Sequence, residues 1–161
     1  MSEIKLNPAG IEFIKKNFSN SFKFRMAMFK MLPMGWLSGM KVTHLDEQKC
    51  SVSVPYKRWK KNPFKSTFWA VLGMAAEMSS GALLVMFTHK QKPSVAMLVV
   101  NCEGEFFKKA TDVTTFTCTG GEQVKKAILS TMTSKEPVLI PLEMEGTNKA
   151  GEVVAKFKFT W

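Results

Sequence analysis

Apolar residues in the first part of the chain follow a helical period. They recur every three or four positions from Ile11 to Phe29. Asn7 before Pro8 is a typical helix start, because Asn caps helices and Pro fits their first turn. We therefore expect one basic, amphipathic helix over residues 7–32. Two interpretations remain open: the helix packs against its own domain, or it lies at a membrane surface.

The rest of the chain alternates between apolar and polar positions, except in one long apolar stretch. A helix that is apolar all round is normally buried, so we expect the stretch 68–87 to form a central helix, capped by Ser66 or Thr67. Its length would span a bilayer, but Glu77 lies at its centre, and we expect no membrane span. Alternation predicts strands at 40–45, 49–56, 94–108, 112–119, 138–146 and 152–161, with a short helical piece at 122–129.

This order of elements predicts an α+β protein in which an antiparallel sheet curls around one central helix. The length of 161 residues suits one domain, and the 13 Phe and 12 Met residues suggest an adaptable interior. A net charge of +10 favours anionic partners without choosing among them.

Cysteines and histidines give little indication of metal or redox chemistry. Cys50, Cys102 and Cys118 form no CxxC pair and the N-terminus lacks a secretory pattern, so we expect free thiols and a cytoplasmic location. The two histidines, His44 and His89, have no ligand spacing, and we expect no metal site.

Glu77 is the only charged residue in the central apolar stretch. An ionised carboxylate there is costly unless something pairs with it or uses it. One interpretation is a structural acid that is hydrogen-bonded or paired with a lysine. The other is a functional acid that a ligand, a water or a partner chain can approach. Its helical neighbours are Gly73, Met74, Ser80 and Gly81, and all of them except Met74 are small.

Asn62 stands fifteen positions before Glu77, in a basic loop over residues 55–65. The basic residues of this loop are Lys57, Arg58, Lys60, Lys61 and Lys65. They can form a solvated surface or hold phosphate groups. The loop also contains Tyr56, Trp59 and Phe64, which could stack on nucleic acid bases. No nucleic-acid-binding motif accompanies them, so a nucleic acid partner is disfavoured.

The order β-β-helix-β-β-β-β resembles the hotdog fold of acyl-CoA thioesterases. Phenylacetate-type members carry an Asn, then His-Gly-Gly at the mouth of the central helix, then an acid, with the spacing of Asn62 and Glu77. The stretches 54–67, 75–81 and 151–157 more closely resemble an uncharacterised thioesterase-like branch, a domain of unknown function. The resemblance covers about residues 35–161, which would form the hotdog domain, with residues 1–34 as an N-terminal helix packed on it.

The resemblance implies a site between two chains of a homodimer, or of a dimer of dimers. Glu77 would be the general base or nucleophile, Asn62 of the other protomer would orient the water or thioester, and the backbone N–H near Trp69 would polarise the carbonyl. The ligand would be an acyl-CoA thioester, with no cofactor. Residues expected to contact it are Lys57, Arg58, Lys60, Lys61, Lys65, Phe68, Gly73, Ser80 and Gly81.

One departure from the family pattern leaves two functions open. Phe68-Trp69-Ala70 stands where the family has His-Gly-Gly. The protein would therefore either hydrolyse an acyl-CoA or bind an acyl-CoA or fatty acyl chain without cleaving it.

Overall fold

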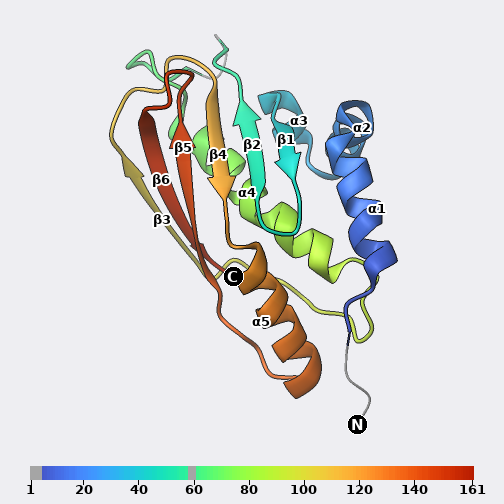
Figure 1. The fold of residues 1–161 in the computed structure, drawn as a ribbon. Coiled ribbons are helices and arrows are strands. Elements are labelled where there is room, and N and C mark those ends of the chain that lie inside the picture. The colour runs from blue at the N-terminus through green and yellow to red at the C-terminus, as the bar shows by residue number, and fades with distance from the viewer. Residues whose placement is uncertain (1–4, 58–60) are drawn as a thin grey trace.

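Six antiparallel strands form one curved sheet in a computed structural model, which describes residues 5–57 and 61–161 (Figure 1). The strand order is β1-β2-β4-β5-β6-β3, and every neighbouring pair is antiparallel. The strands are β1 (Lys41–Leu45), β2 (Cys50–Val54), β3 (Asn101–Phe106), β4 (Thr114–Cys118), β5 (Pro141–Thr147) and β6 (Val153–Thr160). The helices are α1 (Pro8–Ser19), α2 (Ser21–Met31), α3 (Pro33–Ser38), α4 (Trp69–Thr88) and α5 (Gly121–Ser134).

The sheet wraps around α4, which confirms the α+β hotdog architecture that the sequence predicts (Figure 1). By length and composition α4 could cross a membrane, yet 61% of its most apolar window is buried inside the fold. Alternate strand residues supply the other half of the core, for example Val52, Phe116 and Phe157. Most of α4 is therefore buried, and its half-buried residues, which include Gly73, Glu77 and Gly81, follow one stripe along the helix.

The N-terminal segment differs from the single helix expected over 7–32. Asn7 caps α1 as predicted, and its side-chain oxygen accepts the N–H of Ala9 at 3.1 Å. The helix then breaks at Asn20, which has an extended backbone and caps α2 by accepting the N–H of Lys23 at 3.0 Å. After Leu32 the chain forms the short helix α3, which begins at Pro33. The domain boundary at residue 34 stays a prediction.

Two further elements differ in extent from their predicted ranges. β3 covers only residues 101–106 of the expected strand 94–108, because Asn101 pairs with Thr160, the last residue of β6, and earlier residues have no strand beside them. The helical piece expected at 122–129 is the longer α5.

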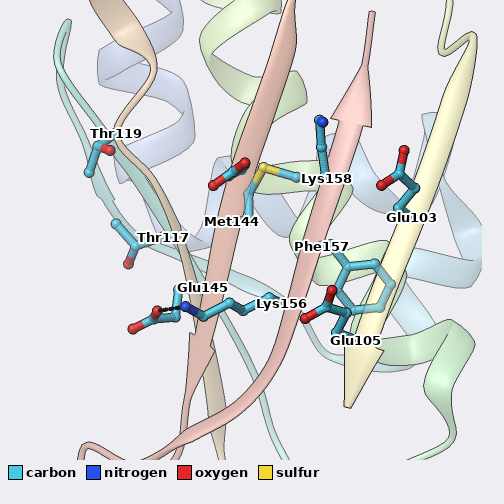
Figure 2. A pocket seen from close by; sticks show the side chains of 10 residues that line it. Glu103, Glu105, Thr117, Thr119, Met144, Glu145, Lys156, Phe157 and Lys158 are labelled. Carbon is cyan, nitrogen blue, oxygen red and sulfur yellow. Dashed lines mark ion pairs between the residues drawn. The ribbon is translucent and has the colours of Figure 1, made fainter. Parts of the chain in front are cut away.

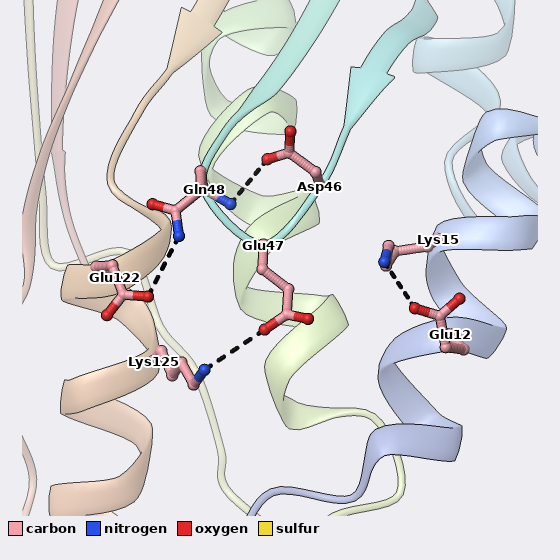
Figure 3. A network of polar contacts seen from close by, with 7 residues as sticks. All are labelled: Glu12, Lys15, Asp46, Glu47, Gln48, Glu122 and Lys125. Atoms are coloured by element: carbon pink, nitrogen blue, oxygen red, sulfur yellow. Dashed lines mark hydrogen bonds and ion pairs between the residues drawn. The ribbon is translucent and has the colours of Figure 1, made fainter.

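Close approach of the β1–β2 turn fixes the start of α5. Gly121 donates its N–H to the Gln48 carbonyl oxygen at 3.0 Å, and a Cβ at this glycine would lie 2.0 Å from the Glu47 oxygen. Figure 3 shows the polar contacts around this junction, including an ion pair of 3.4 Å between Lys125 and Glu47. A side chain larger than hydrogen at position 121 would therefore push the turn and the helix apart.

The outer face of the sheet carries charged side chains in cross-strand rows. Register places Glu103, Lys158 and Glu143 in one row, and Glu105, Lys156 and Glu145 in the next. These rows line a hollow of about 540 Å³, and Lys156 lies 3.0 Å from Glu145 (Figure 2). Exposed pairs of this kind contribute little net stability, and the face is best described as a solvated sheet surface.

The two edges of the sheet differ. At one end, β1 carries a bulge between Val42 and His44, and α1 and α2 pack beside it. At the other end, β3 pairs with β6 in unbroken register, and all six of its residues are exposed. In the described chain nothing pairs with the outer edge of β3, which leaves a row of backbone groups open to another strand.

Candidate functional site

The N-terminus of α4 opens onto a cavity. Phe68 is the N-cap residue and provides no side-chain hydrogen bond. The caps expected from the sequence are engaged elsewhere: Ser66 Oγ accepts the N–H of Ala110 at 2.9 Å, and Thr67 Oγ1 donates to its carbonyl at 3.1 Å. Among the described residues, the N–H groups of Trp69 and Ala70 have no acceptor. They are available to an oxyanion or a carbonyl oxygen.

This cavity at the mouth of α4 has a volume of about 380 Å³. Its lining is apolar on one side and basic on the other: Asn62, Phe64, Ser66, Thr67, Trp69, Leu72, Phe106, Phe107, Lys108 and Lys109. Sequence reasoning missed Lys108 and Lys109, which arrive from the end of β3. The run Phe106-Phe107-Lys108-Lys109 has the same mixed character as the basic loop, but only the fold brings the two together.

Asn62 uses part of its side chain to shape its own loop. Its Oδ1 accepts the N–H groups of Phe64 at 3.0 Å and Ser66 at 3.1 Å, and Lys65 adopts a positive φ of 60° in the same turn. The amide nitrogen has no acceptor among the described residues. Asn62 can therefore still donate one hydrogen bond into the cavity.

Glu77 lies two turns inside α4, half-buried and facing β3. Burial raises the pKa of its carboxyl group. Burial also raises the pKa of the Cys102 thiol on β3, and the charge of Glu77 raises it further, so the carboxyl group acts on β3 through its charge. The carboxylate makes no hydrogen bond or ion pair with any described residue, so the interpretation of Glu77 as a paired structural acid has no support in the described chain.

The small residues next to Glu77 contact aromatic rings of β6 and the residue that follows it. Gly73 packs against Phe157, and Gly81 packs against Trp161. Ser80 donates to the Glu77 carbonyl at 3.0 Å and accepts the indole N–H of Trp161 at 3.1 Å. The space that the sequence suggested for a ligand is thus occupied by the protein's own rings on this side. Ligand contact at Gly73, Ser80 and Gly81 stays a prediction.

Asn62 and Glu77 do not share a cavity within one chain. Asn62 lines the mouth with Trp69, whereas Glu77 is not among the lining residues. The eight residues from Trp69 to Glu77 correspond to about 12 Å along a helix axis. A single carbonyl group cannot contact both ends of that distance.

The basic loop is only partly described. Lys61 lies over the ring of Tyr56 at 4.5 Å from its centroid, which occupies one of the rings that could have stacked on a base. Lys57 and Lys65 are exposed, and the Lys65 carbonyl accepts the Tyr56 hydroxyl at 3.1 Å. Arg58 and Lys60 lie outside the described residues. Phe68 contacts Trp69 edge to face, and both rings are exposed at the mouth.

Solved structures share this fold at low sequence identity. A protein of unknown function from Pseudomonas aeruginosa, PA5026, described as a probable thioesterase, is 16% identical with a TM-score of 0.71 over 99% of this chain and 96% of its own. OLEI01261 from Chlorobaculum tepidum, a protein of unknown function, is 13% identical with a TM-score of 0.72. The match covers 99% of this chain and 96% of its own. The Escherichia coli PaaI protein from the phenylacetic acid degradation operon is 13% identical with a TM-score of 0.62. The match covers 89% of this chain and 93% of its own.

These similarities establish a thioesterase-like hotdog fold. A comparison with curated proteins finds no match. The family described as "Domain of unknown function (DUF4442)" matches residues 21–161, which is most of the sequence. The chain therefore belongs to the DUF4442 family.

Proposed function

We propose that the protein is an acyl-CoA thioesterase in which Glu77 acts as the general base or nucleophile. The observation that carries this proposal is an acid with a raised pKa, half-buried in an apolar helix, without a polar partner in the described chain. A carboxylate whose pKa is moved toward neutral is suited to accept a proton in catalysis. The thioesterase-like hotdog fold supports the same reaction class by analogy.

A working site requires two copies of the chain. Glu77 and the α4 mouth of one chain are too far apart to act on one thioester, as their separation along the helix shows. Glu77 faces β3, whose outer edge is open. Pairing of two β3 edges would place each Glu77 near the interface, where the mouth of the other chain can complete the site. The proposal therefore includes a homodimer, with a dimer of dimers as a possible extension.

The reaction then follows from the groups at hand. Glu77 takes a proton from water, and the oxygen of that water attacks the thioester carbonyl carbon. Backbone N–H groups of Trp69 and Ala70 stabilise the negative charge on the carbonyl oxygen, while Asn62 orients the water or the thioester. The C–S bond breaks, the proton held by Glu77 passes to the leaving sulfur, and a carboxylic acid and free coenzyme A result.

Basic side chains of the loop and of the segment after β3 would hold the phosphates of coenzyme A. Lys57, Lys61 and Lys65 come from the loop, and Lys109 adds a cation that makes no ion pair with a described residue. Lys108 pairs with Glu152 and is less available. Ligand binding by Arg58, Lys60 and Phe68, and a cytoplasmic location, belong to this proposal as well.

A panel of acyl-CoA substrates with detection of released thiol tests the proposal. We expect Glu77→Gln to lower kcat by about 10²–10⁴-fold, the usual contribution of a positioned acid or base. Glu136→Gln, at an exposed acid after α5, is the matched control and should keep wild-type rates. Equal turnover of the wild type and Glu77→Gln on every hydrolysed substrate would remove Glu77 from the mechanism.

Cys102 provides a separate test of the dimer. It is the exposed cysteine on β3, whereas Cys50 and Cys118 are buried. In a β3-paired dimer we expect a maleimide to label Cys102 at least tenfold more slowly at high than at low protein concentration. Unchanged labelling across concentrations, with a monomer in ultracentrifugation, would contradict the shared site.

Binding without hydrolysis is the second candidate function, and the mouth itself favours it. Phe68 and Trp69 place two aromatic rings where an acyl group would approach the backbone. Calorimetry with the same acyl-CoA panel distinguishes the two functions. Tight binding with no thiol release, in both wild type and Glu77→Gln, would identify a binding protein.

A further inference from the structure

A large apolar surface lies on α2 and α3, away from the candidate site. Seven large apolar side chains there are between 45 and 79% exposed: Phe22, Met26, Phe29, Met31, Leu32, Met34 and Leu37. We call these residues the α2–α3 surface. Single exposed apolar residues are normal, but this many exposed apolar side chains on two helices that pack on each other indicate an interaction site.

The fold does not require this surface. α2 buries Phe24 and Met28 beneath it, and through these residues it packs on the rest of the domain. On the opposite side, Phe22, Met26 and Phe29 follow one another at four and three positions, so they form a second apolar stripe along the helix. A surface helix normally has one such stripe, and a second stripe that faces solvent needs a partner of its own.

The charges around the stripe have one sign. At 100° per residue, Lys23 and Lys30 flank it on one side and Arg25 on the other. Between Glu12 and Asp46 the chain contains no acidic residue and six basic ones: Lys15, Lys16, Lys23, Arg25, Lys30 and Lys41. An apolar stripe bordered only by cations is complementary to a uniformly anionic surface with an apolar interior.

The position of this surface in the fold leaves the rest of the molecule free. α1 and α2 pack beside β1, at the opposite end of the sheet from β3 (Figure 1). Contact through α2 and α3 therefore does not compete with a strand that pairs on β3. No residue of α2 or α3 lines the cavity at the mouth of α4.

We propose that the α2–α3 surface docks the protein on anionic phospholipid bilayers. Phe22, Met26 and Phe29 enter the headgroup region, and Lys23 and Lys30 contact lipid phosphates. This goes beyond the proposed thioesterase activity and does not depend on it. It assigns the N-terminal helices a function of their own, in addition to covering β1.

Flotation of the full chain with vesicles tests the proposal. We expect the protein to float with vesicles of phosphatidylcholine and phosphatidylglycerol in equal parts, and to stay behind with phosphatidylcholine alone. Lys23→Gln with Lys30→Gln should weaken binding roughly thirtyfold, since each basic residue near an anionic surface contributes about fivefold. Phe22→Ser with Met26→Ser should weaken it roughly tenfold or more, because both side chains lie on the stripe and are 76% and 46% exposed.

Matched variants separate this surface from a general attraction of a basic protein. Lys126→Gln with Lys149→Gln removes two exposed lysines elsewhere, and Val138→Ser with Leu139→Ser removes two exposed apolar residues elsewhere. Both controls should bind nearly as the wild type does. If the controls lose as much binding as the α2–α3 variants, or if the wild type does not float, the proposal is wrong. It is also wrong if Phe22→Ser with Met26→Ser changes the oligomeric state in ultracentrifugation but leaves flotation unchanged, since the surface then joins two copies.

Discussion

The two ends of the candidate site, the mouth of α4 and its middle, are built in opposite ways. At the mouth, aromatic rings are exposed, the helix has no side-chain cap, and a cavity of about 380 Å³ adjoins it. In the middle, Phe157 and Trp161 pack against the small residues on either side of Glu77. The mouth is a cavity without an acid, and the middle holds a half-buried acid that does not line this cavity.

This difference assigns a separate task to each region. The mouth offers backbone N–H donors and cations, which suit the carbonyl and phosphates of a ligand. The middle holds one carboxylate in apolar surroundings, which suits proton transfer. Neither region alone holds all the groups that the proposed hydrolysis requires, which is why the proposal places the reaction between two chains.

The largest effect should come from removing a buried ring that packs against the middle of α4. Phe157 is 3% exposed and packs against Phe116 and Gly73. We expect Phe157→Ala to lower the free energy of unfolding by about 3–5 kcal/mol, since it removes a buried ring and leaves a cavity. Phe64→Ala, at a ring of the mouth that is 72% exposed, should change it by less than about 0.5 kcal/mol. Urea unfolding measures both, and similar losses would contradict the contrast between the two regions.

A smaller effect is expected from the polar contact that closes one side of Glu77. Trp161→Phe keeps a ring near Gly81 but removes the N–H that Ser80 accepts at 3.1 Å. We expect a loss of about 1 kcal/mol in the free energy of unfolding. Combining it with Ser80→Ala forms a double-mutant cycle. Strictly additive losses in urea unfolding would show that this hydrogen bond contributes nothing.

The smallest effect, and one of opposite sign, should come from Glu77 itself. Because its pKa is raised in the folded chain, the folded state binds the proton more tightly than the unfolded state does. The free energy of unfolding therefore falls as the pH rises from 4.5, the ordinary pKa of the carboxyl group, through the raised pKa of the folded state.

Glu77→Gln removes this penalty. It should raise the melting temperature on the order of 2 °C at pH 8, with no gain below the ordinary carboxyl pKa. A variant that melts lower than the wild type at pH 8 would instead reveal a favourable partner for the carboxylate.

The sequence predicted the succession of strands and helices along the chain, the central helix and the position of Glu77 within it, because periodicity reports burial directly. It did not predict the break at Asn20. An Asn residue can lie within a helix or cap one, and only the structure shows that the Asn20 side chain accepts the backbone N–H of Lys23. It also missed Lys108 and Lys109 at the mouth, and the rings of Phe157 and Trp161 beside Glu77. These contacts join residues far apart in the chain, and no local pattern encodes them.

The unequal edges of the sheet limit how the protein can assemble. A sheet that is open at both edges can add strands without end and grow into a fibre. Here the β1 edge is bulged and flanked by helices, while β3 is regular and unpaired in the described chain. Once two β3 strands meet about a two-fold axis, neither copy has a second regular edge to offer. Edge pairing in this molecule is therefore self-terminating.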